Sequence, residues 1–231
     1  MQPDPTILAF DTSAAHCAAA LLKDGSICGE ALEHLSRGQA ERLMPMLEDV
    51  LAKQAIDWND LDAIAVGIGP GNFTGIRISV SAARGLSLAL GIPALGVSLF
   101  EVMRQCGDVD AAAPPASELV SLEAPRGTVY VQAFRGGEPY GAPRQIDPEA
   151  PPEDLGLTEA ARVIGNRAED IAPPFKAEAR PAVLSNIAEH IAQIAQARLA
   201  GDTGTPARPA PLYVRPADAA PPRDPAPVIL P

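Results

Sequence analysis

The segment from Leu61 to Gly91 reads LDAIAVGIGPGNFTGIRISVSAARGLSLALG. An apolar run over residues 63–66 predicts a short buried strand, a glycine-rich loop follows it, and the pattern after Thr74 has helical spacing. We expect Thr74 to cap the start of this helix, and Gly91, with Pro93 soon after it, to end it. The segment therefore predicts one strand, loop and helix unit. Its helix carries many small side chains, which bury little area alone and allow another helix to pack closely against it.

The density of glycine in this loop invites comparison with phosphate-binding loops. A Walker A loop would need a lysine and a hydroxyl after its last glycine, but Gly75 is followed by Ile76 and Arg77. The dinucleotide fingerprint would need a third glycine where Asn72 stands. The residues alone favour a tight turn that lets helix and strand pack closely, with a phosphate site as the alternative.

Length and composition indicate a globular protein. The 231 residues suit one large or two small domains, and a content of 47% hydrophobic and 20% charged residues is typical of a chain that buries a real core. The formal net charge of -11 repels polyanions, so we do not expect this chain alone to grip RNA. Residues 1–5 lack a basic start and no apolar run approaches ~20 residues, so we expect a cytoplasmic protein with no membrane association.

The sequence shows no metal or disulfide pattern. The three cysteines, at positions 17, 28 and 106, form no CxxC motif, and the three histidines, at positions 16, 34 and 190, form no HxxxH or HExxH pair. We therefore predict free cysteines in apolar surroundings, solitary or internally satisfied histidines, and no metal site.

The N-terminal pattern predicts a strand over residues 6–10 that ends at Asp11, followed by a hairpin whose strands cover 17–22 and 26–31. This order resembles the start of the actin, Hsp70 and sugar-kinase ATPase fold, in which the first turn meets phosphate and metal. In those ATPases a glycine usually stands where this chain has Ser13. We therefore favour a turn and capping role for Asp11 over a retained metal role, which stays the alternative.

Local patterns predict the remaining elements. Residues 39–52 carry apolar side chains at helical spacing, and Pro45 among them predicts a kink or a late helix start near Met44. Ser98 and Glu101 have the spacing of a capping box at the start of another helix. Further on, the patterns predict strands over 118–122, 128–134 and 162–164, a loose proline-rich connection over 139–152, and a helix over 183–199.

Four segments in this order resemble the bacterial TsaB (YeaZ) family, whose members take part in tRNA threonylcarbamoyladenosine synthesis. They are GIGPGNFTGIRISVSAARGLSLALGIPALGVS (67–98), ILAFDTSAAHCAAALLKDG (7–25), QAERLMPMLEDVL (39–51) and PLYVRPADA (211–219). The first is a long and distinctive motif, whose usual form in the family is GPGSFTGLRIG followed by a helix of small residues. The resemblance covers most of the chain.

The resemblance implies an α/β fold of the actin, Hsp70 and sugar-kinase type (the ASKHA fold), with two lobes of mixed sheets and flanking helices. We place the N-terminal lobe, which holds the glycine loop, at residues 1–105 and the C-terminal lobe at 106–215, with the helix over 183–199 packing back against one of the lobes. Residues 216–231 are rich in proline and are expected to form a disordered tail.

The resemblance also implies a function. By this comparison the chain is a noncatalytic subunit that binds and activates a TsaD-like enzyme, which forms threonylcarbamoyladenosine in tRNAs that read ANN codons. A TsaE-like ATPase is expected to work with the assembled complex, and tRNA to be contacted only through that complex. We expect a homodimer when the chain is alone, no tightly bound cofactor, and ATP or ADP only at the junction with the partner.

For the sites, we expect no catalytic residue and no metal ligand. Weak candidates for contact with a nucleotide are Asp11, Thr12, Gly69 and Gly71. The expected partner interface lies on the two helices around 43–51 and 76–90, and its residues are Leu43, Met44, Leu47, Arg77, Ser81, Arg84, Gly85 and Leu88. The family usually has Asp-Ala-Arg where this chain has Glu123-Ala124-Pro125, which weakens any role for that arginine here.

Two alternatives stay open from the sequence. The chain could be an independent ATPase or a metallopeptidase-like enzyme of the same fold, but it lacks a metal-binding histidine pair, a Walker lysine and a glycine at position 13. The two helices could also do no more than cover their own sheet with a solvated outer face. We favour the noncatalytic subunit.

Overall fold

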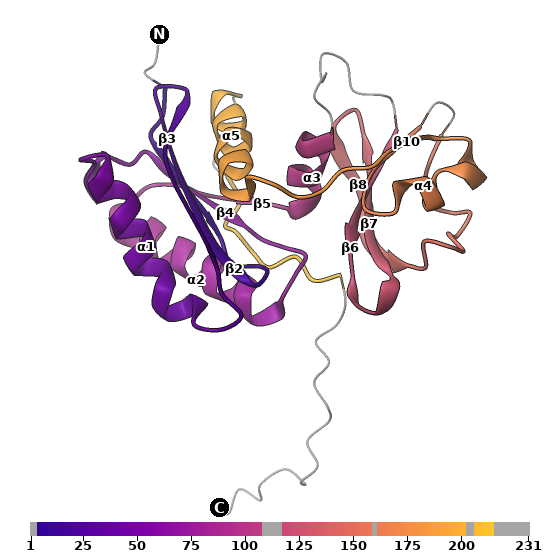
Figure 1. The fold of residues 1–231 in the computed structure, drawn as a ribbon. Helices are drawn as coiled ribbons and strands as arrows, with labels where there is room; N and C mark the ends of the chain where they lie inside the picture. The colour runs from indigo at the N-terminus through magenta and orange to yellow at the C-terminus, as the bar shows by residue number, and fades with distance from the viewer. Residues whose placement is uncertain (1–3, 108–116, 159–160, 202–205, 215–231) are drawn as a thin grey trace, which may run out of the picture.

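The computed structural model describes residues 4–107, 117–158, 161–201 and 206–214. Within these ranges the strands form two five-stranded mixed sheets, one in each of the two lobes seen in Figure 1. The predicted tail, residues 216–231, lies outside the described residues. Two mixed sheets with flanking helices confirm the predicted fold class. In the described ranges no helix combines the length and apolar character that a membrane span requires.

The first sheet has the strand order β3-β2-β1-β4-β5. β1 pairs antiparallel with β2 and parallel with β4, so the predicted N-terminal hairpin forms one edge of a mixed sheet. Every residue of β1 and β4 is buried, as expected for central strands covered on both faces. The strands are β1 (Ile7–Asp11), β2 (His16–Lys23), β3 (Ser26–His34), β4 (Ala63–Gly67) and β5 (Ala94–Val97).

Helices cover both faces of the first sheet (Figure 1). α1 (Gln39–Lys53) and α2 (Phe73–Leu90) pack side by side on one face, where their apolar side chains join those of β1 and β4 in one cluster. α5 (Ile187–Ala200) packs on the other face against β1 and β2. The helix predicted over 183–199 thus begins four residues later than expected and returns to the N-terminal sheet.

The second sheet has the strand order β10-β9-β6-β7-β8 and is reached through α3 (Leu99–Gly107), which packs against β6 and β9. Side chains of β1, α3, α5 and β6 belong to one apolar cluster, so the packing is continuous from one sheet to the other. The remaining elements are β6 (Glu118–Glu123), β7 (Val129–Arg135), β8 (Glu138–Ile146), β9 (Arg162–Gly165), α4 (Ala168–Ile171), β10 (Glu178–Arg180) and the short 3-10 turns Trp58–Asp60, Pro125–Gly127 and Pro173–Phe175.

Two local predictions were wrong, and one of the two alternatives predicted at Pro45 is excluded. The connection predicted over 139–152 contains β8, an edge strand in which proline is tolerated because one side of an edge strand needs no backbone donors. α1 begins at Gln39 and runs through Pro45, so the helix does not start late. The cap of α2 is Asn72, whose side chain accepts a hydrogen bond of 2.9 Å from the Gly75 amide, and not Thr74.

Residues 206–214, the C-terminal strap, run beside the glycine loop that follows β4. The Leu212 amide donates a 2.8 Å hydrogen bond to the carbonyl oxygen of Ile68. The side chains of Leu212 and Val214 pack against the apolar cluster shared by the two sheets. The strap therefore fastens the end of the described chain to the loop between β4 and α2.

Candidate functional site

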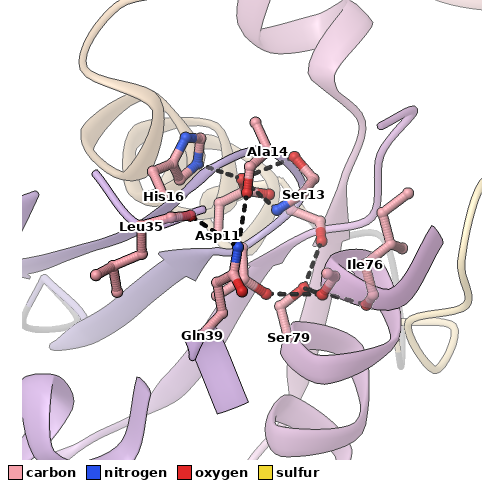
Figure 2. Close-up of polar contacts among 11 residues, drawn as sticks. Asp11, Ser13, Ala14, His16, Leu35, Gln39, Ile76 and Ser79 are labelled. Carbon is pink, nitrogen blue, oxygen red and sulfur yellow. Dashed lines mark hydrogen bonds and ion pairs between the residues drawn. The ribbon is translucent and has the colours of Figure 1, made fainter. Parts of the chain in front are cut away.

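The turn after β1 is organised by Asp11, whose side chain is completely buried. Its Oδ1 atom accepts three hydrogen bonds, from the Ser13 amide at 2.9 Å, from the Ser13 hydroxyl at 2.8 Å and from His16 Nε2 at 2.8 Å (Figure 2). Its Oδ2 atom is buried and has no hydrogen-bond partner among the described residues. The predicted turn and capping role of Asp11 is therefore what its contacts show, with His16 as an additional partner.

The glycines of the loop lie against this turn. A Cβ atom at residue 67 would lie 1.9 Å from Asp11 Oδ2, and one at residue 71 would lie 2.3 Å from the carbonyl oxygen of Ser13. At residue 75 it would lie 1.9 Å from the carbonyl oxygen of Thr12. Each distance is far shorter than van der Waals contact. Glycine therefore permits the close approach of the two backbones at residues 71 and 75, and of the Asp11 side chain at residue 67.

Polar contacts close the same junction. The Thr12 hydroxyl donates to the carbonyl oxygen of Gly75 at 2.7 Å, and the Asn72 amide donates to the carbonyl oxygen of Ser13 at 2.6 Å. Ser79, in the second turn of α2, places its hydroxyl near the carbonyl oxygens of Gly67 at 3.3 Å and Ile76 at 3.2 Å. The turn after β1 and the start of α2 are thus joined directly.

This junction brings three of the four nucleotide candidates, Asp11, Thr12 and Gly71, together. ATP and a divalent cation are the groups that the fold implies at such a turn, but the residues do not fit them. The Cβ sides of Gly71 and Gly75 face the backbone of the turn, and Ser13 stands where those ATPases have glycine. A divalent cation needs several oxygen ligands, and the described ranges contain no group of three or more His, Cys, Asp or Glu side chains placed to hold one.

Gly69 has a different environment from the other glycines. Its φ of 100° lies in the region that favours glycine, and a Cβ atom there would lie 2.6 Å from Ile76 Cδ1 and 3.2 Å from the carbonyl oxygen of Leu212. The Cβ side of this residue is therefore occupied by α2 and by the C-terminal strap.

The five predicted interface residues on α2 all lie on its outer surface. Arg77, Ser81, Arg84 and Gly85 are exposed, and Leu88 is 85% exposed. A Cβ atom at residue 85 would meet nothing within 4 Å. The helix therefore presents an open stripe with an exposed apolar side chain near its end.

Two of the predicted interface residues lie elsewhere. Leu43 and Leu47, on α1, are 1% and 0% exposed and belong to the core beneath that helix. They are the apolar face by which α1 covers its own sheet, so their side chains do not reach the surface. Met44 is half-buried at the edge of the same core, and is the one residue of the three that reaches the surface.

Sequence reasoning missed a cluster around Arg77. Its guanidinium lies over the Phe73 ring, with Cζ 3.8 Å from the ring centroid, and its Nε donates to the Tyr213 hydroxyl at 2.8 Å. The rings of Phe73 and Tyr213 stack with centroids 4.8 Å apart. Tyr213 belongs to the C-terminal strap, 136 residues from Arg77 along the chain, and no local pattern signals such a contact.

A second polar cluster lies between α3 and α5. Burial alone would raise the pKa of the Cys106 thiol, but hydrogen bonds to His190 and to the Ser185 backbone outweigh it, and the pKa lies below its ordinary value. The same hydrogen bond with Cys106 raises the pKa of His190.

The free cysteines differ in burial. Cys17 is buried while Cys28 is exposed, contrary to the apolar surroundings predicted for all three.

Comparison with known proteins gives consistent matches. The family profile of TsaD, tRNA N6-adenosine threonylcarbamoyltransferase, matches residues 32–140. The "tRNA threonylcarbamoyladenosine biosynthesis protein TsaB" of Escherichia coli (strain K12) is 35% identical over 132 residues, which cover 57% of this chain and 56% of that protein. The chain spans about half the length of the relatives it matches in sequence.

Solved structures extend the likeness over the whole described fold. YeaZ from Pseudomonas aeruginosa superposes with a TM-score of 0.64 at 28% identity, and covers 90% of this chain and 99% of its own. An inorganic polyphosphate/ATP-glucomannokinase from an Arthrobacter strain superposes with a TM-score of 0.50 at 13% identity, over 84% of this chain and 99% of its own, and shows the fold alone. In sequence and in fold, the chain is therefore similar to proteins of the TsaB (YeaZ) family.

Proposed function

We propose that this chain is a noncatalytic subunit in the formation of threonylcarbamoyladenosine in tRNA, and that it acts by binding and activating a TsaD-like enzyme. The names of its relatives support a role in this pathway, because the E. coli and Bacillus subtilis proteins are both called tRNA threonylcarbamoyladenosine biosynthesis protein TsaB. The match to the TsaD profile supports a shared ancestry of this chain and the enzyme.

The observation that carries the noncatalytic role is the closure of the glycine loop on the Asp11 turn. In an ATPase of this fold the first turn must leave space for phosphate and metal. Here Thr12 and Ser13 contact Gly75 and Gly71 through their backbones, at distances that exclude even a Cβ atom. The loop thus packs against the turn. This packing supports the proposal that the chain retains the ATPase fold without its phosphate site.

The open stripe of α2 supports the binding part of the proposal. It exposes Leu88 with small neighbours, and the half-buried Met44 of α1 lies on the adjoining helix. Small residues allow a partner helix to lie close, and methionine adapts to different partners. The same surface would form the homodimer when the TsaD-like partner is absent.

The remaining partners follow from charge and from the closed turn. A chain with a net charge of -11 is poorly suited to hold tRNA by itself, so tRNA would be bound through the assembled complex. That complex would modify the tRNAs that read ANN codons. A TsaE-like ATPase would act on that complex. ATP or ADP would bind only at the junction with the TsaD-like partner. The complex would act in the cytoplasm.

Hydrolysis by the purified chain separates this proposal from the alternatives. We expect no release of phosphate from ATP by the chain alone and no cleavage of peptide substrates, but saturable binding of a TsaD-like enzyme in calorimetry. Repeated hydrolysis of ATP by the chain alone would instead establish an independent ATPase, and metal-dependent peptide cleavage would establish a metallopeptidase-like enzyme. Absence of both hydrolysis and binding would also contradict the proposed role.

A further inference from the structure

Arg77 is held in one orientation by two aromatic rings, while part of its guanidinium stays open. The group lies over Phe73, and its Nε is bound to the hydroxyl of Tyr213, which itself stacks on Phe73. The two terminal nitrogens have no hydrogen-bond or ion-pair partner within the described part of the chain. An exposed arginine normally samples many rotamers, so this stacking reduces the ordering that binding would require.

The charged side chains of α2 are all positive. α2 contains two arginines, Arg77 and Arg84, both exposed, and no Asp or Glu. This lies within a chain whose net charge is -11. The stripe is therefore a local cationic surface on an acidic protein, and charge complementarity selects a partner that offers carboxylates there.

We infer that Arg77, Phe73 and Tyr213 form a preorganised receptor for a carboxylate side chain, Asp or Glu, of a partner protein. The two terminal nitrogens match the two oxygens of a carboxylate in a bidentate pair, a geometry that lysine does not reproduce. Tyr213 is a positioning residue, since its hydroxyl binds Nε and leaves the two terminal nitrogens of the guanidinium available to the partner. The C-terminal strap thereby contributes to the surface of a helix far from it in sequence.

This inference rests on the proposed function, because it names the chemistry by which the TsaD-like partner would be recognised. Phosphates of RNA could also bind an arginine fork, but the net charge of the chain opposes close approach of RNA. An acidic surface on a second copy of this chain is the other occupant that the test must separate.

The test measures binding of the TsaD-like enzyme to the full chain by calorimetry. Arg77→Ala should weaken binding by roughly ten- to a hundred-fold, the loss expected of a charge-assisted pair. Arg77→Lys keeps the charge and should still lose about ten-fold. Tyr213→Phe keeps the ring but removes the hydroxyl, and should weaken binding by a few-fold.

A double-mutant cycle identifies the positioning role. In the Arg77→Lys background, Tyr213→Phe should have almost no further effect, whereas independent contributions would add. A matched control lies in the second lobe, where the Arg135 guanidinium stands over the Tyr140 ring with Cζ 3.6 Å from its centroid. Arg135→Lys and Tyr140→Phe should leave binding unchanged.

The outcomes separate the two levels of the account. If the wild-type chain does not bind the TsaD-like enzyme, the proposed function fails. If the wild type binds and the folded Arg77→Lys and Tyr213→Phe variants bind equally well, the carboxylate receptor is overturned while the proposed function stands. Loss confined to self-association or to binding of purified tRNA would also overturn it, because the receptor would then serve a different partner.

Discussion

The Thr12 hydroxyl donates a 2.7 Å hydrogen bond to the carbonyl oxygen of Gly75, and a Cβ atom at residue 75 would lie 1.9 Å from the carbonyl oxygen of Thr12. The backbone of the first turn and that of the glycine loop are therefore in direct contact. We predict that Gly75→Ala, which forces two backbone segments apart, destabilises the protein by about 3 kcal/mol. Urea unfolding monitored by circular dichroism measures this change.

Gly85 is the matched control for Gly75, because it belongs to the same helix but its added Cβ would meet nothing within 4 Å. Gly85→Ala should stabilise the protein by about 0.5 to 1 kcal/mol, since glycine in a helix loses more conformational entropy than alanine. Equal effects of the two substitutions would show that the contact with Thr12 does not constrain the loop.

Asp11 offers a second prediction on stability. Asp11→Ala leaves the Ser13 amide, the Ser13 hydroxyl and His16 without their shared acceptor in a buried site, and should cost about 3 kcal/mol. Asp11→Asn retains one oxygen that can accept these bonds and should cost about 1 kcal/mol. Both are measured by urea unfolding. A larger loss for Asn than for Ala would contradict the capping role.

The same substitution separates capping from catalysis. If Asp11 serves only the fold, the folded Asp11→Asn variant should stimulate a TsaD-like enzyme as well as the wild type does at a temperature where both are folded. Complete loss of stimulation in a variant with normal stability would instead assign Asp11 a chemical role.

Much of the first lobe could be predicted from the sequence because its signals are local. The hairpin, the strand over 63–67 and the Gly91 cap each depend on residues that are neighbours in the chain, and the Ser98 and Glu101 capping box is present as predicted. The strand β8 was missed because its prolines indicate a loop unless the strand is known to lie at an edge.

The candidate site was predictable only in part. The glycines identified the loop, but the atoms they contact, in the turn at Thr12 and Ser13, lie about sixty residues earlier and carry no signal of the contact. Leu43 and Leu47 were assigned to an interface although their spacing equally suits the covering of a sheet, which is where they lie. Arg77 meets Tyr213 only because the C-terminal strap runs beside the glycine loop, and this tertiary contact has no signal in the local sequence.

The environment of Cys106 gives a prediction of pH dependence. Its thiolate is the species that reacts with iodoacetamide, and its pKa is lowered, so the alkylation rate should reach its half-maximum at a lower pH than for an ordinary cysteine thiol. His190→Gln removes the imidazole and leaves burial as the strongest influence, so the midpoint should move to higher pH. Peptide mass spectrometry follows Cys106 separately from Cys28, and an unchanged midpoint in the variant would refute the pairing.

The outer stripe of α2 can be tested with bulky residues. Ser81→Trp with Gly85→Trp adds two large side chains at exposed positions, where the protein itself has room for them. The double variant should remain folded, yet lose both the homodimer in light scattering and the binding of a TsaD-like enzyme in calorimetry, because small residues allow the helices to approach. Undiminished association of the folded variant would place the interface elsewhere.

The most direct test of the noncatalytic role is a reconstituted modification reaction. Purified TsaD-like enzyme, TsaE-like ATPase, ATP, a threonylcarbamoyl donor and tRNA are combined with and without this chain, and threonylcarbamoyladenosine is quantified by mass spectrometry of the digested tRNA. We predict formation of the modified nucleoside only when both the chain and the TsaD-like enzyme are present, and none from the chain without that enzyme. Equal yield without the chain, or modification by the chain in the absence of the TsaD-like enzyme, would contradict the account.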